Sequence, residues 1–118
     1  MSHTTITAGV VAPAVVLLTI SSSDTVAVSA ALGNDFRLNL TTNAAIGNPT
    51  GSVDGQRITI QVTQGSGAPF TLTWGSQYNF GSAGAPALSA EAGNTDVLGF
   101  VYNAALGSWL CVGAALGF

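Results

Sequence analysis

The chain has 118 residues, of which 47% are hydrophobic and 6% are charged, and its formal net charge is −3. This length fits one domain, and high apolar content with few charges excludes an intrinsically disordered chain. Apart from one histidine, Arg37 and Arg57 are the only basic residues. The chain therefore cannot neutralise a run of phosphates, and we expect neither a nucleic acid nor a membrane as a direct partner.

The first twenty residues differ in composition from the rest. Residues 2–5 are polar, whereas residues 8–18 are almost wholly apolar but too short to cross a bilayer and interrupted by Pro13. No lysine or arginine precedes Arg37, so a secretory signal is not expected. An apolar segment of this kind should not stay in water. We therefore predict an N-terminal arm or first strand over residues 1–20, which packs on its own core or on another subunit, followed by a domain over residues 21–118.

The remaining residues show the two-residue period of β-strands. Apolar side chains alternate with polar ones over residues 36–41, 57–63 and 70–74. Further strands are predicted at residues 15–20, 25–32, 78–80, 96–103 and 108–112. About eight short strands need a second layer to cover their apolar faces. The sequence thus predicts an all-β fold, an antiparallel β-sandwich or jelly-roll-like barrel, and shows no internal repeat of solenoid length.

Two segments are rich in turn-forming residues. Residues 48–55 contain Pro49 and end in Asp54-Gly55, which predicts a surface loop with a turn before the next strand. Residues 64–69 are short, flexible and polar, and they predict a hairpin between two antiparallel strands.

The sequence offers little to catalysis. Its only imidazole, His3, lies two residues from the start, and its only thiol, Cys111, lies in an apolar strand where we expect it to be buried. Glu91 and Asp96 are close in sequence, but their stretch is rich in turn residues, where carboxylates accept hydrogen bonds from backbone amides. We expect no enzyme activity, no metal site and no cofactor.

Four aromatic residues could stack on sugar rings. Trp74, Tyr78, Tyr102 and Trp109 all fall within predicted strands, and we expect two of the four in the core. Tyr78 and Tyr102 are the candidates for display on the surface.

Five segments together suggest a family. They are Gly33-Asn34-Asp35-Phe36-Arg37-Leu38-Asn39-Leu40, Asp54-Gly55-Gln56-Arg57-Ile58-Thr59-Ile60, Thr71-Leu72-Thr73-Trp74-Gly75, Thr95-Asp96-Val97-Leu98 and Trp109-Leu110-Cys111-Val112. In these segments the chain resembles small β-rich virion proteins of tailed bacteriophages, among them capsid decoration (cement) proteins and modules of tail fibres. The resemblance covers roughly residues 25–112. It implies a structural role as a homotrimer on the outer surface of the phage head, and it carries no catalytic motif.

These considerations define the expected function. We expect a homotrimeric decoration protein that binds the major capsid protein and stabilises the head. The expected contacts with the capsid or between subunits are Val10, Val11, Pro13, Val15, Val16, Leu17 and Phe118. The alternative is a receptor- or carbohydrate-binding module of a tail fibre or spike, with Tyr78 and Tyr102 as ligand contacts.

Overall fold

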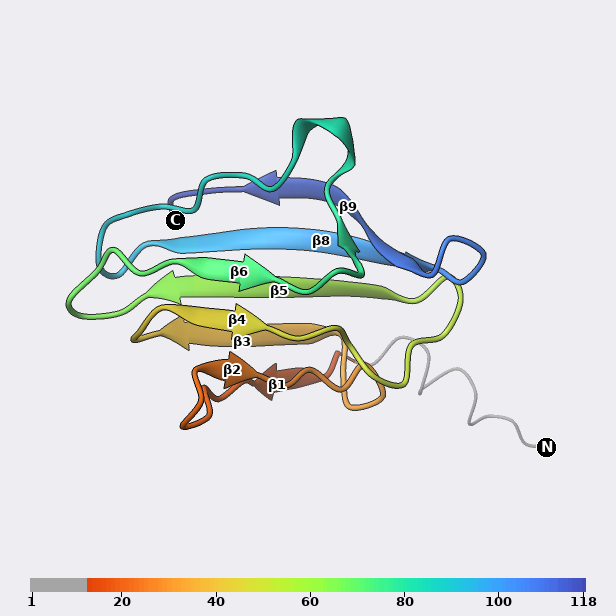
Figure 1. Ribbon diagram of the computed structural model, residues 1–118, viewed down its shortest axis with the longest axis horizontal. Coiled ribbons are helices and arrows are strands. Elements are labelled where there is room, and N and C mark those ends of the chain that lie inside the picture. The colour runs from red at the N-terminus through yellow and green to blue at the C-terminus, as the bar shows by residue number, and fades with distance from the viewer. Residues whose placement is uncertain (1–12) are drawn as a thin grey trace.

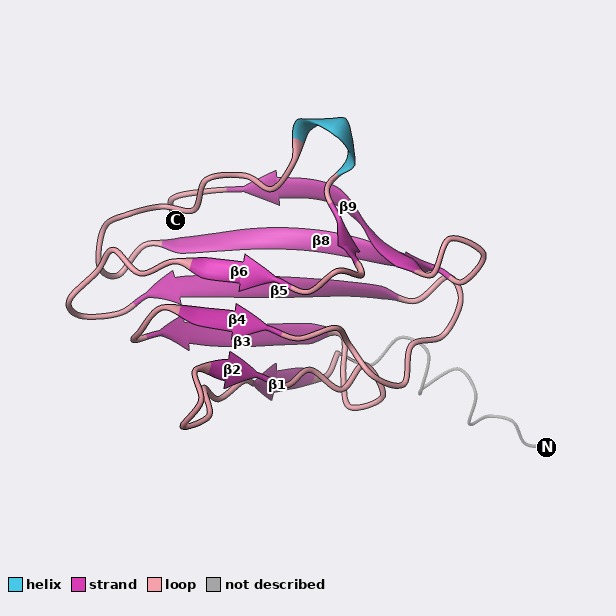
Figure 2. Ribbon diagram, viewed as in Figure 1, coloured by secondary structure: helices cyan, strands magenta, loops and turns pink. Residues whose placement is uncertain are grey.

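The computed structural model describes residues 13–118, and nearly all of its regular structure is β (Figure 2). The predicted all-β class is therefore confirmed. The strands are β1 (Val15–Leu17), β2 (Thr25–Val26), β3 (Asp35–Leu40), β4 (Ala44–Ile46), β5 (Arg57–Gln64), β6 (Leu72–Trp74), β7 (Tyr78–Asn79), β8 (Thr95–Asn103) and β9 (Ser108–Ala115). One short 3-10 turn, η1, covers Gly81–Ala83. Within residues 13–118 no helix is long and apolar enough to cross a membrane.

The strands form two sheets. The large sheet has the order β1-β3-β5-β8-β9-β7, and the small sheet has the order β2-β4-β6. The small sheet lies across one part of the large sheet, with β2, β4 and β6 over β1, β3 and β5 (Figure 1). Both sheets contribute to one continuous hydrophobic core.

The prediction of an antiparallel fold is wrong for the N-terminal half of the described chain. Every pair in the small sheet is parallel, as are β1–β3 and β3–β5 in the large sheet. Among the strands of residues 13–118, only β5–β8 and β8–β9 are antiparallel pairs, and β7 pairs with β9 in parallel. The sequence period did not reveal this, because alternate residues point to opposite faces in both kinds of sheet.

The chain between β1 and β6 winds as a coil that alternates between the sheets. Val15 is aligned with Asp35, which is aligned with Thr59, and in the small sheet Thr25 is aligned with Ala45. This winding is present although the sequence shows no internal repeat of solenoid length. Successive turns of this coil differ in length and residue type, so they leave no fixed period in the sequence.

The segment at residues 64–69 is a crossover between the sheets and not the predicted hairpin, because β5 and β6 belong to different sheets. Its geometry is fixed by Gln64, whose buried side chain donates to the carbonyl of Phe70 (2.9 Å) and accepts from the amide of Phe70 (3.1 Å). The Gln64 side chain therefore pairs with the main-chain amide and carbonyl of Phe70, which in a hairpin would pair with the opposite strand. The turn predicted at Asp54-Gly55 is confirmed, with Gly55 at a φ of 82°.

The core forms from the alternate apolar residues that the sequence singled out. On β3 Phe36, Leu38 and Leu40 are buried, and on β5 the buried residues include Ile58 and Ile60. Other strand predictions were less accurate, and of the predicted strand 15–20 only residues 15–17 are a strand. Only residues 25–26 of the predicted strand 25–32 are a strand, and β4 was missed because its alternation lasts three residues.

The C-terminal part of the space between the layers is filled by aromatic rings. Trp74 lies with its ring centroid 5.1 Å from that of Tyr78 and 5.2 Å from that of Phe80, while Phe100 lies 5.4 Å from Tyr78. Edge-to-face contacts of this kind add to the gain from burial. This aromatic cluster, Trp74, Tyr78, Phe80 and Phe100, seals the core beyond β6.

At the other end, β1 is held close to the main chain that precedes β3. A side chain at Gly33 would bring its Cβ within 2.5 Å of the carbonyl oxygen of Ala14 and 2.8 Å of Val16. Because real Cβ atoms do not approach a carbonyl oxygen so closely, only glycine allows β1 to sit here.

Candidate interaction surfaces

The outer edge of β1 is an unpaired strand edge in the described chain. The carbonyl of Ala14 accepts from the amide of Asn34 (3.0 Å), and the amide of Leu18 donates to the carbonyl of Arg37 (2.8 Å). Main-chain groups of alternate residues point to opposite sides of a strand. Those of Val15 and Leu17 therefore point away from β3. Their side chains are also exposed, by 50% and 75%.

A groove lies beside this edge, between β1 and β2. Its volume is about 500 Å³. The apolar residues that line it include Val16, Leu18, Val26, Val28 and Leu32. Val16 and Leu18 are half-buried and pack on the core, whereas Leu32 is 66% exposed. Within residues 13–118 no strand precedes β1, so nothing in this part of the chain closes the groove.

The C-terminal half of β9 forms the opposite edge of the large sheet. β7 pairs with β9 only at Trp109 and Leu110, so no described strand borders β9 from residue 111 to residue 115. Val112 is 62% exposed, and Phe118 is 71% exposed. The backbone of Phe118 is nevertheless fixed, because its amide and carbonyl each bond to Thr95 at 2.9 Å. The Phe118 ring is thus held in place at the surface.

Neither edge carries a charged side chain. No Asp, Glu, Lys or Arg occurs in residues 13–18 or after Asp96. The charged residues nearest to β1 along the sheet neutralise each other: Arg37 donates to Asp35 at 2.8 Å on β3. Partial burial raises the pKa of Asp35, but hydrogen bonds from Arg37, Thr59 and Gln61 and the Arg37 charge outweigh it and lower the pKa overall.

Asp96 is a buried carboxylate that connects β8 to two other segments of the chain by hydrogen bonds. It lies in β8 and accepts from the amide and hydroxyl of Ser89, both at 2.6 Å, and from the amide of Gly117 at 2.8 Å. The prediction that it binds backbone amides is confirmed, although it lies in a strand and not in a turn. Glu91 is exposed, so the two carboxylates do not share a cleft.

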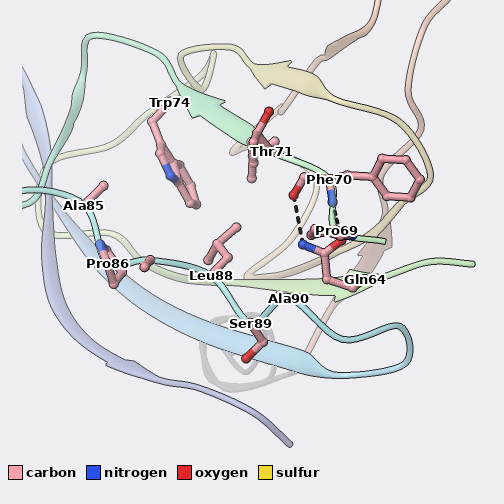
Figure 3. Close-up of a pocket in the computed structure, with 12 residues that line it drawn as sticks. Gln64, Pro69, Phe70, Thr71, Trp74, Ala85, Pro86, Leu88, Ser89 and Ala90 are labelled. Atoms are coloured by element: carbon pink, nitrogen blue, oxygen red, sulfur yellow. Dashed lines mark hydrogen bonds between the residues drawn. The ribbon is translucent and has the colours of Figure 1, made fainter. Parts of the chain in front are cut away.

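A second groove, of about 300 Å³, lies between β6 and residues 85–90. In Figure 3 the indole of Trp74 and the side chain of Leu88 point into it, and Pro86 borders it. The amide of Gln64 lies at one end but is already paired with Phe70. This groove is therefore mainly apolar, with one aromatic surface.

Two of the four aromatic candidates, Trp109 and Tyr78, are in the core as expected. For Tyr78 this corrects the alternative prediction of a displayed ligand contact. Its hydroxyl donates to the carbonyl of Gly47 at 2.9 Å, and burial raises its pKa. Tyr102 is half-buried, with its ring centroid 5.0 Å from that of Trp109.

The structure separates the predicted contact residues into two groups. Pro13, Val15 and Leu17 are exposed at the β1 edge, where Val16 points inward and is half-buried. Phe118 belongs to the opposite edge, and β3, β5 and β8 lie between. Val10 and Val11 lie outside the described residues, as does His3. Sequence reasoning missed Val112 and Leu32; the uncharged stretch after Asp96 was the available signal for Val112.

Cys111 is half-buried, so the expectation of full burial is wrong. The reason is that β7 ends at Asn79 and leaves this part of β9 without a neighbour. No group of three or more histidine, cysteine, aspartate or glutamate side chains in residues 13–118 is placed to hold a metal ion.

A scan against protein-family models and searches of curated proteins and of solved structures find no match to this chain.

Proposed function

We propose that this chain is a non-enzymatic structural protein of a bacteriophage virion, a homotrimeric decoration protein that binds the major capsid protein on the outside of the head and stabilises it. The observation that carries the proposal is the pair of exposed, uncharged edges of the large sheet, at Val15 to Leu17 and at Val112 to Phe118. Exposed apolar strand edges are rare in proteins that work alone, because they bind other strands.

The chemistry of these edges suits a protein that strengthens a shell. Contacts without ion pairs keep their strength when the salt concentration outside a cell changes, because screening acts on charges. A stable contact buries about 800 Å² on each partner. Unpaired main-chain groups and apolar side chains provide hydrogen bonds and burial for such a contact.

The oligomeric state is the first test. Size-exclusion chromatography with light scattering is expected to give the mass of three copies at micromolar concentration. This mass should change little between 50 mM NaCl, where the Debye length is about 14 Å, and 1 M NaCl, where it is about 3 Å. A stable monomer under these conditions contradicts the proposal.

The role of the N-terminal segment needs a deletion that spares the fold. Removal of residues 2–12 keeps β1, whereas removal through residue 18 also removes Val16 and Leu18, which pack on the core. We expect the shorter deletion to lower occupancy on heads of the virus that encodes the chain, without loss of folding. Unchanged occupancy, measured by electron cryo-microscopy of the heads, would show that the segment does not contact the capsid.

The second candidate function is a receptor- or carbohydrate-binding module of a tail fibre. The groove beside Trp74 favours it, because an indole face is a common platform for sugar rings (Figure 3). A glycan array distinguishes the two functions. Ala87→Trp fills the groove from an exposed position and spares the aromatic cluster. Specific binding that Ala87→Trp abolishes supports this second function, and absence of binding across host glycans favours decoration.

A further inference from the structure

We propose that neighbouring copies assemble by sheet extension: the outer edge of β9 in one copy pairs with the outer edge of β1 in the next. The inference rests on the proposed homotrimer and adds which two surfaces meet. Each edge has unpaired main-chain groups and exposed apolar side chains within the described chain. Strand addition at an open sheet edge satisfies those groups.

Symmetry favours two different edges over one. If β1 paired with β1 of a second copy, the contact would be isologous and would stop at a dimer. A ring of three copies needs a heterologous contact, in which each copy uses one surface to bind and a second one to be bound. The large sheet offers two such surfaces at its opposite sides, β1 and residues 111–115 of β9.

The strand directions agree with this pairing. β1, β3 and β5 run parallel, while β8 runs antiparallel to β5 and β9 runs antiparallel to β8. β9 therefore runs in the same direction as β1. A rotation axis that lies along the strands brings β9 of one copy beside β1 of the next as a parallel pair. This pair extends the parallel arrangement of β1, β3 and β5 by one strand.

The side chains on both faces of the added strand are compatible with the new position. Ala115 is aligned with Val97 on the outer face of the sheet, where Val15 and Leu17 are exposed. Ala114 is aligned with the buried Leu98, so it belongs to the inner face. On that face the added strand covers the 500 Å³ groove beside Val16.

The charges also agree. Neither strand edge carries an Asp, Glu, Lys or Arg side chain, and the pair formed by Asp35 and Arg37 beside β1 is already neutralised. Pairing of the two edges therefore leaves no charge buried without a partner, which is the main cost of a polar interface.

Cysteine trapping tests the pairing directly. In a Cys111→Ser background, which removes the single native thiol, Leu17→Cys is combined with Val112→Cys and the protein is oxidised. Paired strands bring Cα atoms within disulfide range, below about 7 Å. On a denaturing gel we expect bands of disulfide-linked dimers and trimers but no larger species, with more than half of the chains cross-linked. Because the register is open, Val15→Cys and Ala115→Cys, which lie on the same outer face as Leu17, complete a set of four double variants.

Two controls make the result specific. Leu17→Cys alone is expected to stay monomeric on the gel, and Leu17→Cys with Leu106→Cys, which places the second thiol in the exposed turn between β8 and β9, is expected not to cross-link. Dimers from Leu17→Cys alone would indicate pairing of β1 with itself and would overturn the proposal. So would absence of cross-links in all four double variants of a protein with the mass of a trimer.

A charge at the edge gives an independent readout. Lysine is the residue with which natural edge strands prevent pairing. We expect Leu17→Lys to raise the concentration of half-dissociation at least tenfold in light scattering, whereas Leu106→Lys leaves it unchanged. A wild-type protein that is itself a monomer contradicts the proposed homotrimer, while a trimer insensitive to Leu17→Lys contradicts only the pairing of β1 with β9.

Discussion

The two ends of the space between the sheets are closed in different ways. Beyond β6 the aromatic cluster fills the space, and Phe100 at its centre is 1% exposed. Between β1 and β2 the lining is aliphatic, and a groove of about 500 Å³ stays open. Rings from three different strands and a loop meet at the closed end, whereas the open end has no further turn of the coil to cover it within residues 13–118.

This difference separates residues that stabilise one copy from residues that are available to a neighbour. At the closed end a removed side chain leaves a cavity that the surrounding rings cannot fill. Val15, Leu17 and Leu32 at the open end, and Val112 and Phe118 at the other edge, are exposed, so the loss of their side chains changes the folded copy little. The following stability measurements use urea unfolding in the Leu17→Lys background, so that assembly does not contribute.

The largest effect is expected at the closed end. Phe100→Ala removes a buried ring that contacts Trp74, Tyr78 and Phe80, and should lower the free energy of unfolding by about 3–5 kcal/mol. Phe118→Ala is the matched control with an exposed ring, and it should change the free energy by less than about 0.5 kcal/mol. Equal effects of the two substitutions would contradict the division between the closed end and the edge.

The next effect concerns the carboxylate that fixes the chain beside the closed end. Asp96→Ala leaves the amides of Ser89 and Gly117 without their acceptor and should cost about 2–3 kcal/mol. Asp54→Ala removes an exposed carboxylate with one such bond, to the amide of Ala104 at 3.0 Å, and should cost less than about 1 kcal/mol. A lower urea midpoint for Asp54→Ala than for Asp96→Ala would show that Asp96 does not hold the segments at Ser89 and Gly117 in place.

At the open end, Gly33→Ala tests whether β1 depends on a close approach. The new methyl group meets the carbonyl oxygen of Ala14, so β1 must shift, at a cost of about 1–2 kcal/mol. Gly113→Ala places a methyl group in open space, and its free energy of unfolding should not fall. If Gly33→Ala leaves the free energy of unfolding unchanged, β1 is not held against β3.

The smallest effect is a pH dependence at the outer face of the large sheet. The pKa of Asp35 is lower in the folded chain than its ordinary value of about 3.9. Its ionised form therefore stabilises the fold above about pH 4, and this contribution is lost as the pH falls through the folded pKa. Because the pair is partly exposed, we expect less than about 1 kcal/mol.

The check compares the Leu17→Lys protein with the same protein carrying Asp35→Asn. The difference in the free energy of unfolding between them should be constant from pH 7 to about pH 5 and shrink below about pH 4. A difference that stays constant to about pH 2.5 would show that the carboxylate of Asp35 does not contribute through its charge.

Particular residues show how far the sequence could predict the site. Val15, Leu17 and Phe118, which the sequence analysis selected as contact residues, have exposed side chains. Their contact with a partner stays a prediction. The place of Phe118 on the edge opposite to β1 was not predictable, because it depends on three intervening strands. Tyr78 was misplaced for a related reason: the carbonyl of Gly47, which pairs with its hydroxyl, is brought close by the fold.

By itself the sequence determined the β class, the inward residues of β3 and β5, and the scarcity of charge along the whole chain. These properties depend on the order of neighbouring residues, and the two-residue period records them directly. Only the tertiary structure decided that the first six strands wind as a parallel coil over two sheets, and that one end of the coil is closed by aromatic rings while the other is open. Strand partners are chosen by contacts between distant segments, and an alternating pattern is equally satisfied by parallel and antiparallel neighbours.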